Sequence, residues 1–274
     1  MDRKPVASGS FYPSDPEDLR DYIRELFLSK RGPGELPDPD GFRGNVGIIA
    51  PHAGYVYSGS TAAHAYLAAS EWGKPDIVVI IGPNHTGYGK SISVWPIGVW
   101  KTPLGNVEVD QSVTNAIVEN FKLASLDYEA HLFEHSIEVH IPFLQFTIGT
   151  GFKIVPICML DQRKEISKEL GIALKKVLHG KRFWVVASTD LNHYEDHETT
   201  LYKDKMIIDA ISSNNIEELY VSIEKEHITM CGPGCVATVM AMDLGRPKIL
   251  KHSTSGEISD DFDREVGYMS ACIC

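Results

Sequence analysis

The sequence predicts an α/β fold with three layers, in which a parallel or mixed central sheet lies between two layers of helices. Runs of β-branched residues such as Ile77–Ile81 are bounded by turn formers, which is typical of strands buried on both faces. Segments with helical spacing alternate with these runs, and that alternation favours a parallel or mixed sheet. The chain has 274 residues, 43% of them hydrophobic, and shows no internal repeat or convincing boundary. We therefore predict a single domain over residues 1–274.

The helices are predicted from apolar residues that recur on one face. Ser14-Asp15-Pro16-Glu17 has a capping-box pattern with proline in the first turn, and it begins a helix that ends near Lys30. The segment from Arg31 to Gly44 is rich in Gly, Pro and Asp and is therefore predicted to be a loop. The later predicted helices are Ser60–Ser70, Asp110–Phe121, Glu165–Leu178, Tyr202–Ser212, Ile216–Lys225 and Cys235–Leu244.

Short apolar runs between these helices predict the strands. Gly82 and Pro83 cannot continue a central strand, so we expect the chain to turn directly after Ile81. The predicted strands are Val46–Ala50, Ile77–Ile81, Ser91–Trp95, Lys153–Cys158, Phe183–Ser188, Lys248–His252 and Val266–Ile273.

The segment from His131 to Leu144 contains three histidines and two glutamates. Glu134 and Glu138 are four residues apart, which would place them on one face of a helix, with apolar residues on the opposite face. Pro142 is expected to kink or end that helix.

Polar side chains follow three of the predicted strands. His52 comes after the first strand, His85 after the second, and Asp190 and His193 after Phe183–Ser188. If these strands are neighbours, the side chains meet at the carboxyl edge of the sheet, where open α/β sheets bind ligands. A single histidine in a strand-end loop is more often a structural residue, but a set of them suggests a site. Imidazoles with a carboxylate or thiolate suit a mononuclear zinc, iron or copper centre.

Other residues could complete such a centre. Cys231 precedes Gly-Pro-Gly at a helix start, where the helix dipole and free N–H groups favour a thiolate; the alternative is a buried, inert thiol. Glu134, His135 and His140 could orient metal-bound imidazoles, or simply belong to a solvated helix face.

The composition argues against several function classes. A net charge of −11 without basic clusters argues against nucleic acids and anionic membranes as partners. No apolar run approaches the roughly 18–20 residues that span a bilayer, and no apolar segment follows the N-terminus, so we expect a cytoplasmic protein. Five widely spaced cysteines indicate reduced thiols without a disulfide framework. The oligomeric state stays open.

The order of short motifs along the chain resembles the Memo family, whose members share a fold with the class III (LigB-like) extradiol dioxygenases. The landmarks span nearly the whole chain. They are Arg3–Pro13, Pro51–Tyr55, Gly82–His85, Glu134–Glu138, Ser188–His193, Met230–Gly232 and Val266–Tyr268.

This resemblance implies that His52, His85 and Cys231 bind a metal, with iron or copper expected, and that Asp190 and His193 line the same pocket. The dioxygenase relatives have a carboxylate as third ligand, so the cysteine argues against cleavage of a catechol ring. The resemblance also implies a shared pathway with an AMMECR-type protein and a radical-SAM protein, as in systems in which the Memo-type protein is component B.

Three hypotheses follow for the function. The first is a metal-dependent oxidoreductase in which His193 acts as general acid or base and Asp190 orients it or a water. The second is a hydrolase in which zinc activates water. The third is a non-catalytic protein that binds a peptide or other partner, or that serves as a metal chaperone.

Overall fold

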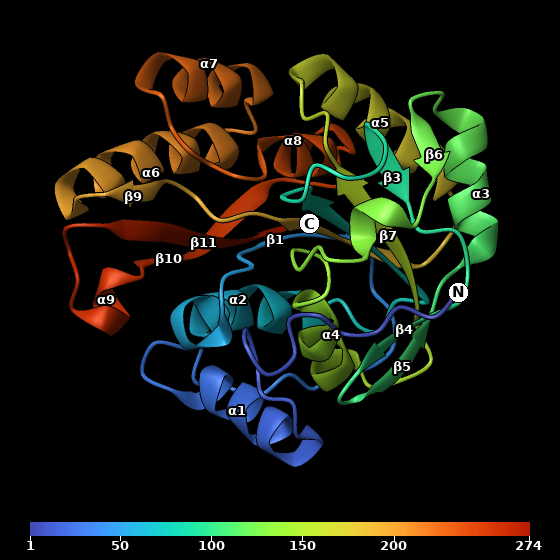
Figure 1. Ribbon diagram of the computed structural model, residues 1–274, viewed down its shortest axis with the longest axis horizontal. Helices are drawn as coiled ribbons and strands as arrows, with labels where there is room; N and C mark the ends of the chain where they lie inside the picture. The colour runs from blue at the N-terminus through green and yellow to red at the C-terminus, as the bar shows by residue number, and fades with distance from the viewer.

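The computed structural model describes all 274 residues, and it has a mixed central sheet between two layers of helices (Figure 1). The fold class predicted from the sequence is confirmed. The helices are α1 (Pro16–Leu28), α2 (Tyr55–Ser70), α3 (Gln111–Asn120), α4 (His140–Ile148), α5 (Lys164–Val177), α6 (His197–Ser212), α7 (Ile216–Glu226), α8 (Pro233–Ala241) and the short α9 (Gly256–Ser259). The strands are β1 (Val46–Ala50), β2 (Ile77–Pro83), β3 (Ile92–Val94), β4 (Val99–Thr102), β5 (Gly105–Glu108), β6 (Ala124–Leu126), β7 (Lys153–Met159), β8 (Phe183–Ser188), β9 (His193–Glu195), β10 (Pro247–Thr254) and β11 (Glu265–Ile273).

The sheet has a parallel centre and antiparallel additions on both sides. Its strand order is β10-β11-β1-β8-β2-β7-β3-β6, and β9 pairs with β11 outside this order. β1, β8, β2 and β7 are parallel to one another, whereas β11 runs antiparallel to β1 and β3 antiparallel to β7. The carboxyl ends of β1, β8 and β2 are therefore adjacent, as the strand-end pattern in the sequence requires.

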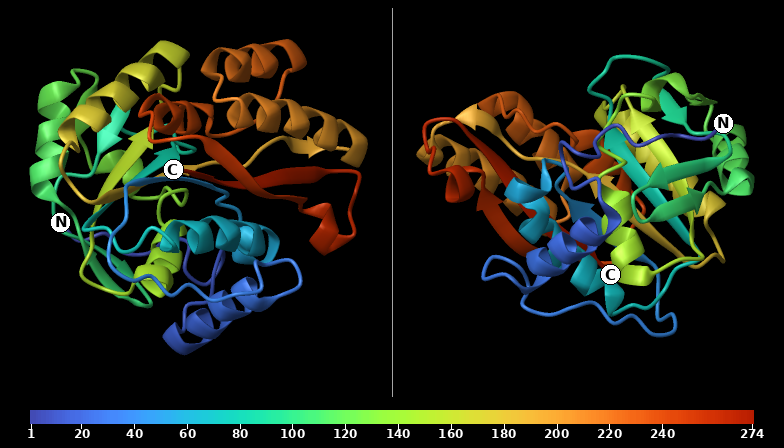
Figure 2. Two further views of the ribbon diagram at one scale, coloured as in Figure 1. Left: turned by 180° about the vertical axis from the view of Figure 1, so that it is seen from behind. Right: turned by 60° about the horizontal axis from the view of Figure 1, so that its bottom comes forward.

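Two hydrophobic cores lie on the two faces of this sheet. One core contains residues of α3, α5, α6, α7 and α8, and the other contains residues of α1, α2 and α4 together with the β4–β5 hairpin. The left view of Figure 2, which shows the molecule from behind, has the two layers of helices on either side of the sheet. Side chains alternate between the cores along each strand, since Val79 and Ile81 belong to the first and Val78 and Ile80 to the second. This explains why the central strands are apolar at nearly every position.

The structure differs from the expected elements at several points. β2 continues through Gly82 to Pro83; pairing with β8 ends at Ile81, so only β7 lies beside the proline. Asp15, not Ser14, caps α1, because its side chain accepts hydrogen bonds from two backbone amides of the first turn. α2 and α6 begin five residues before the predicted starts, at Tyr55 and His197. The short strands β6 and β9 were not predicted, because three residues carry no clear alternation.

The expected helix through Glu134 and Glu138 is wrong. The helix α4 begins only at His140, and the segment before it forms turns. Pro142 lies in the first turn of α4, where a missing amide proton costs no helical hydrogen bond, and so it neither kinks nor ends the helix. No helix of the structure has the length and apolar character needed to cross a membrane.

Candidate metal centre

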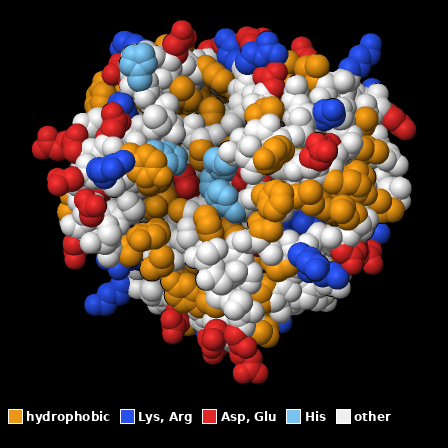
Figure 3. Space-filling model, viewed as in Figure 1, with side chains coloured by type: hydrophobic (Ala, Val, Ile, Leu, Met, Phe, Trp, Pro, Cys, Tyr) orange, Lys and Arg blue, Asp and Glu red, His pale blue; other side chains and the backbone are white.

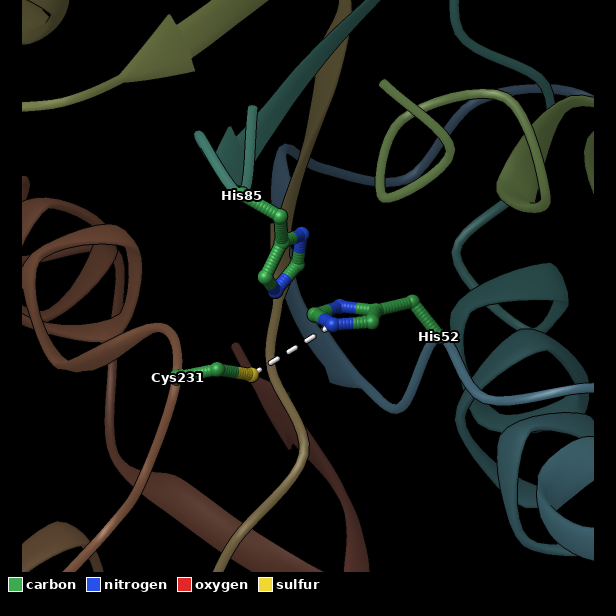
Figure 4. A group of neighbouring side chains, drawn as sticks. All are labelled: His52, His85 and Cys231. Carbon is green, nitrogen blue, oxygen red and sulfur yellow. Dashed lines mark hydrogen bonds between the residues drawn. The ribbon is translucent and has the colours of Figure 1, made fainter. Parts of the chain in front are cut away.

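Three residues from distant parts of the chain converge at the carboxyl edge of the sheet. His52 follows β1, His85 follows β2, and Cys231 lies in the loop that enters α8. Their side chains point toward one another (Figure 4). Because β8 lies between β1 and β2, the loop after β8 brings Asp190 and His193 to the same edge. The predicted meeting of polar strand ends is therefore present in the structure.

The donor atoms of this trio are close enough to share one ion. Cys231 Sγ lies 3.3 Å from His52 Nε2, and one ligand atom from each of His52, His85 and Cys231 lies within 4.8 Å of the others. Two imidazole nitrogens and one sulfur form a donor set that suits zinc, iron or copper. The residues present thus fit the metal centre that the sequence led us to expect.

Glu134 holds His85 from behind. Its Oε1 lies 2.9 Å from His85 Nδ1, and its Oε2 accepts a hydrogen bond of 2.6 Å from the backbone N–H of His85. A carboxylate only accepts, so Nδ1 carries the proton and Nε2 of His85 keeps its lone pair for a ligand.

This contact also changes the pKa values of both side chains. Burial lowers the pKa of His85, but the hydrogen bond and the charge of Glu134 outweigh it and leave that pKa raised. For Glu134, burial raises the pKa, whereas the hydrogen bond and charge of His85 lower it more, to about 2. Glu134 is therefore a permanent anion at neutral pH.

His52 is buried and neutral. Burial lowers its pKa well below the usual value, and the neighbouring His135 and His85 lower it further. Its Nδ1 lies 2.6 Å from Ser188 Oγ, so that Nε2 faces Cys231. Ser188 in turn lies 2.8 Å from His140 Nε2, which places His140 behind the site without direct access to it.

The thiol of Cys231 does not have the low pKa that its position before a helix led us to expect. Burial raises its pKa and the nearby Asp190 raises it further, although the backbone N–H of Asp190 donates to Sγ at 3.1 Å. Burial likewise raises the pKa of Asp190, to about 6. A metal ion would have to displace the thiol proton.

The donor set forms the floor of an open cleft of about 610 Å³. Figure 3 shows histidine side chains gathered in a hollow near the centre of this face, with hydrophobic side chains around it. His135 and His193 both line the cleft, and His135 stacks on His85 with ring centroids 5.0 Å apart. His193 Nδ1 has no hydrogen-bond partner. Phe11, Tyr194, Val266 and Tyr268 supply the apolar part of the lining.

All eight candidate residues lie in or directly behind this cleft. His52, His85, His135, Asp190, His193 and Cys231 line it, whereas Glu134 and His140 are buried behind its histidines. Ser188 and Tyr66 connect His140 to its surroundings, and neither was predicted to belong to the site. Ser188 is the last residue of a predicted strand and lies close to Asp190 in the sequence, so its place in the site could have been predicted. Tyr66 lies inside an Ala-rich helix, where no sequence feature indicates a role in the site.

Comparisons with known proteins agree with this architecture. A family model described as "Memo-like protein" matches residues 3–272. A MEMO1 family protein from Thermotoga sp. (strain RQ2) is 50% identical over 100% of both chains, and one from Sulfurisphaera tokodaii is 43% identical over 98% of both. The crystal structure of an uncharacterized protein from Escherichia coli K12 matches 84% of this chain and 99% of that one, with a TM-score of 0.58 and 14% identity. That likeness concerns the fold alone.

Proposed function

Because this chain belongs to the Memo-like protein family, we propose that it is an oxidoreductase with a single iron or copper ion bound by His52, His85 and Cys231. The observation that carries the proposal is the convergence of these three donors, within 4.8 Å of one another, at the floor of an open cleft. Three protein ligands leave coordination positions free, which is the arrangement of catalytic rather than structural sites.

The identity of the donors favours a redox-active ion. A thiolate is a softer ligand than a carboxylate and donates more charge, which suits iron and copper. When bound, such an ion supplies electron transfer to a substrate or to O₂ that enters the cleft. A thiolate ligand at this position also distinguishes the site from the carboxylate-containing centres of the dioxygenases that the sequence resembles.

The remaining cleft residues support proton transfer. His193 lines the cleft, so its imidazole can take up a proton there or give one to a bound substrate. Asp190 accepts the backbone N–H of His52 at 2.8 Å through Oδ1, and its Oδ2 lies 4.0 Å from His52 Nε2. We assign it to holding the His52 loop and orienting water beside the donors.

The choice of metal decides between redox and hydrolytic chemistry. Protein purified without oxygen is analysed for metal content, then loaded separately with iron, copper or zinc, and O₂ uptake is followed with ascorbate as reductant. We expect O₂ uptake above that of the free ions with iron or copper, none with zinc, and none above that of the free ions with His85→Ala. Hydrolytic activity that is highest with zinc, without O₂ uptake by the other two forms, would contradict an oxidoreductase.

A further inference from the structure

A chain of hydrogen-bonded side chains runs from the interior to His52. Tyr66 Oη lies 2.7 Å from His140 Nδ1, and His140 Nε2 lies 2.8 Å from Ser188 Oγ. Ser188 Oγ then lies 2.6 Å from His52 Nδ1. All four side chains are buried, so an unmatched donor or acceptor here would be destabilising. The proton positions along the chain are therefore strongly constrained.

One contact sets the direction of every hydrogen bond in this chain. Ser188 Oγ lies 2.7 Å from the carbonyl oxygen of Ser136, and a carbonyl oxygen can only accept. Ser188 thus donates its single hydroxyl proton to Ser136. Its two lone pairs remain to accept protons from His52 Nδ1 and His140 Nε2.

The hydrogen bond at the Tyr66 end of this series of side chains agrees with the assignment. Burial lowers the pKa of His140 to about 3, so its ring is neutral and carries one proton, on Nε2. His140 Nδ1 then accepts from the hydroxyl of Tyr66, whose only hydrogen-bond partner is this atom. Every donor along the chain meets an acceptor in this arrangement.

We propose that Ser188, His140 and Tyr66 are positioning residues that fix His52 in the tautomer with an unprotonated Nε2. A neutral imidazole can carry its proton on either ring nitrogen, and only an unprotonated nitrogen binds a metal. Nε2 is the atom that lies 3.3 Å from Cys231 Sγ. The role of this tautomer in metal binding rests on the proposed metal centre, whereas the tautomer itself is a property of the protein without metal.

The turn before α4, which contains Glu134 and Ser136, is connected to both histidines of the donor set. Ser136 accepts from Ser188 through its carbonyl, and its backbone N–H donates at 2.9 Å to Glu134, the partner of His85. Its hydroxyl donates at 2.9 Å to the carbonyl of Pro83 at the end of β2. A Cβ at Gly82 would lie 2.4 Å from this hydroxyl oxygen, so the strand end needs glycine there. The turn before α4 therefore contacts the hydrogen-bond partners of both His52 and His85.

The test combines tautomer and affinity measurements. In metal-free protein with ¹⁵N-labelled histidine, long-range ¹H–¹⁵N correlation at neutral pH is expected to show His52 with Nδ1 protonated and Nε2 unprotonated. Ser188→Ala should abolish the preference and weaken iron or copper binding about 10–100-fold, the usual loss when a residue that orients a ligand is removed. Ser70→Ala, which removes a buried hydroxyl bonded only within α2, should change neither.

Each outcome decides the proposal. A parent protein in which His52 Nε2 carries the proton overturns it, and so does a Ser188→Ala variant that keeps both the tautomer and the metal affinity. If no metal binds to any form, the proposed function fails. The tautomer measurement on parent and variants then still tests whether Ser188 fixes the tautomer of His52. If Ser188→Ala does not fold, Tyr66→Phe replaces it: His140 Nδ1 loses its only donor, so its ¹⁵N signal should move towards that of a nitrogen without a hydrogen bond while Nε2 stays protonated against Ser188. An unchanged Nδ1 signal, or a His140 that carries its proton on Nδ1, overturns the proposal.

Discussion

Replacement of Cys231 by serine is expected to abolish stoichiometric binding of iron or copper. The sulfur is the only soft donor in the set and lies 3.3 Å from His52 Nε2, whereas a serine hydroxyl stays protonated and binds these ions weakly. We expect the dissociation constant to rise by more than about 100-fold, beyond the 10–100-fold effect of residues that only orient a ligand. Equilibrium dialysis of each apo protein against each ion, with metal content measured on both sides of the membrane, gives this change.

A second cysteine provides the matched control. Cys235 lies one helical turn further on, is buried in α8, and is not part of the donor set. Cys235→Ala should therefore keep metal binding within a few-fold of the parent. If Cys231→Ser still binds one equivalent of iron or copper with the parent's affinity, Cys231 is not a ligand of the metal.

The largest loss of stability is expected for Arg3→Ala. This buried guanidinium donates at 2.5 Å to Glu138 Oε2 and at 2.8 Å to the carbonyl of His131, and it lies 4.1 Å from the ring centroid of Trp100. Glu138 would lose its only charged partner in the interior. Removal of one member of a buried ion pair costs roughly 3–5 kcal/mol, because the other charge remains without compensation. Denaturant unfolding gives the change in the free energy of unfolding.

An exposed ion pair is the control for this prediction. Arg182 and Asp76 also form a close, two-pronged contact, but their side chains are more than half exposed. Arg182→Ala should lower the free energy of unfolding by no more than about 1 kcal/mol. If the two variants lose equal stability, the buried Arg3–Glu138 pair contributes no more to folding than an exposed pair.

The positions of the metal-binding candidates were predictable because they depend on simple features of strands. His52, His85 and Asp190 each follow a short apolar run that is typical of a buried strand, and parallel strands end at one edge. Cys231 was less certain from sequence, since a thiol near glycine and proline is equally compatible with a buried, inert residue. The structure places all four in one cleft.

The conformation before α4 was not predictable from local spacing. Glu134 and Glu138 have the separation of neighbours on a helix, but each forms hydrogen bonds with a distant segment. Glu134 bonds to His85, and Glu138 accepts from the backbone of Val6 and Ala7 and from the hydroxyl of Tyr12. These partners lie far away in the sequence and satisfy the carboxylates more completely than a solvated helix would. Local periodicity contains no information about such contacts.

X-ray absorption spectroscopy of protein loaded with one equivalent of iron or copper tests the central claim most directly. The account predicts a first shell with one sulfur and two imidazole nitrogens from the protein, completed by lighter oxygen or nitrogen ligands. The sulfur contribution should disappear in Cys231→Ser, and one imidazole contribution should disappear in His85→Ala. A first shell of oxygen and nitrogen alone in the parent protein, or a spectrum unchanged by both substitutions, would contradict the proposed centre.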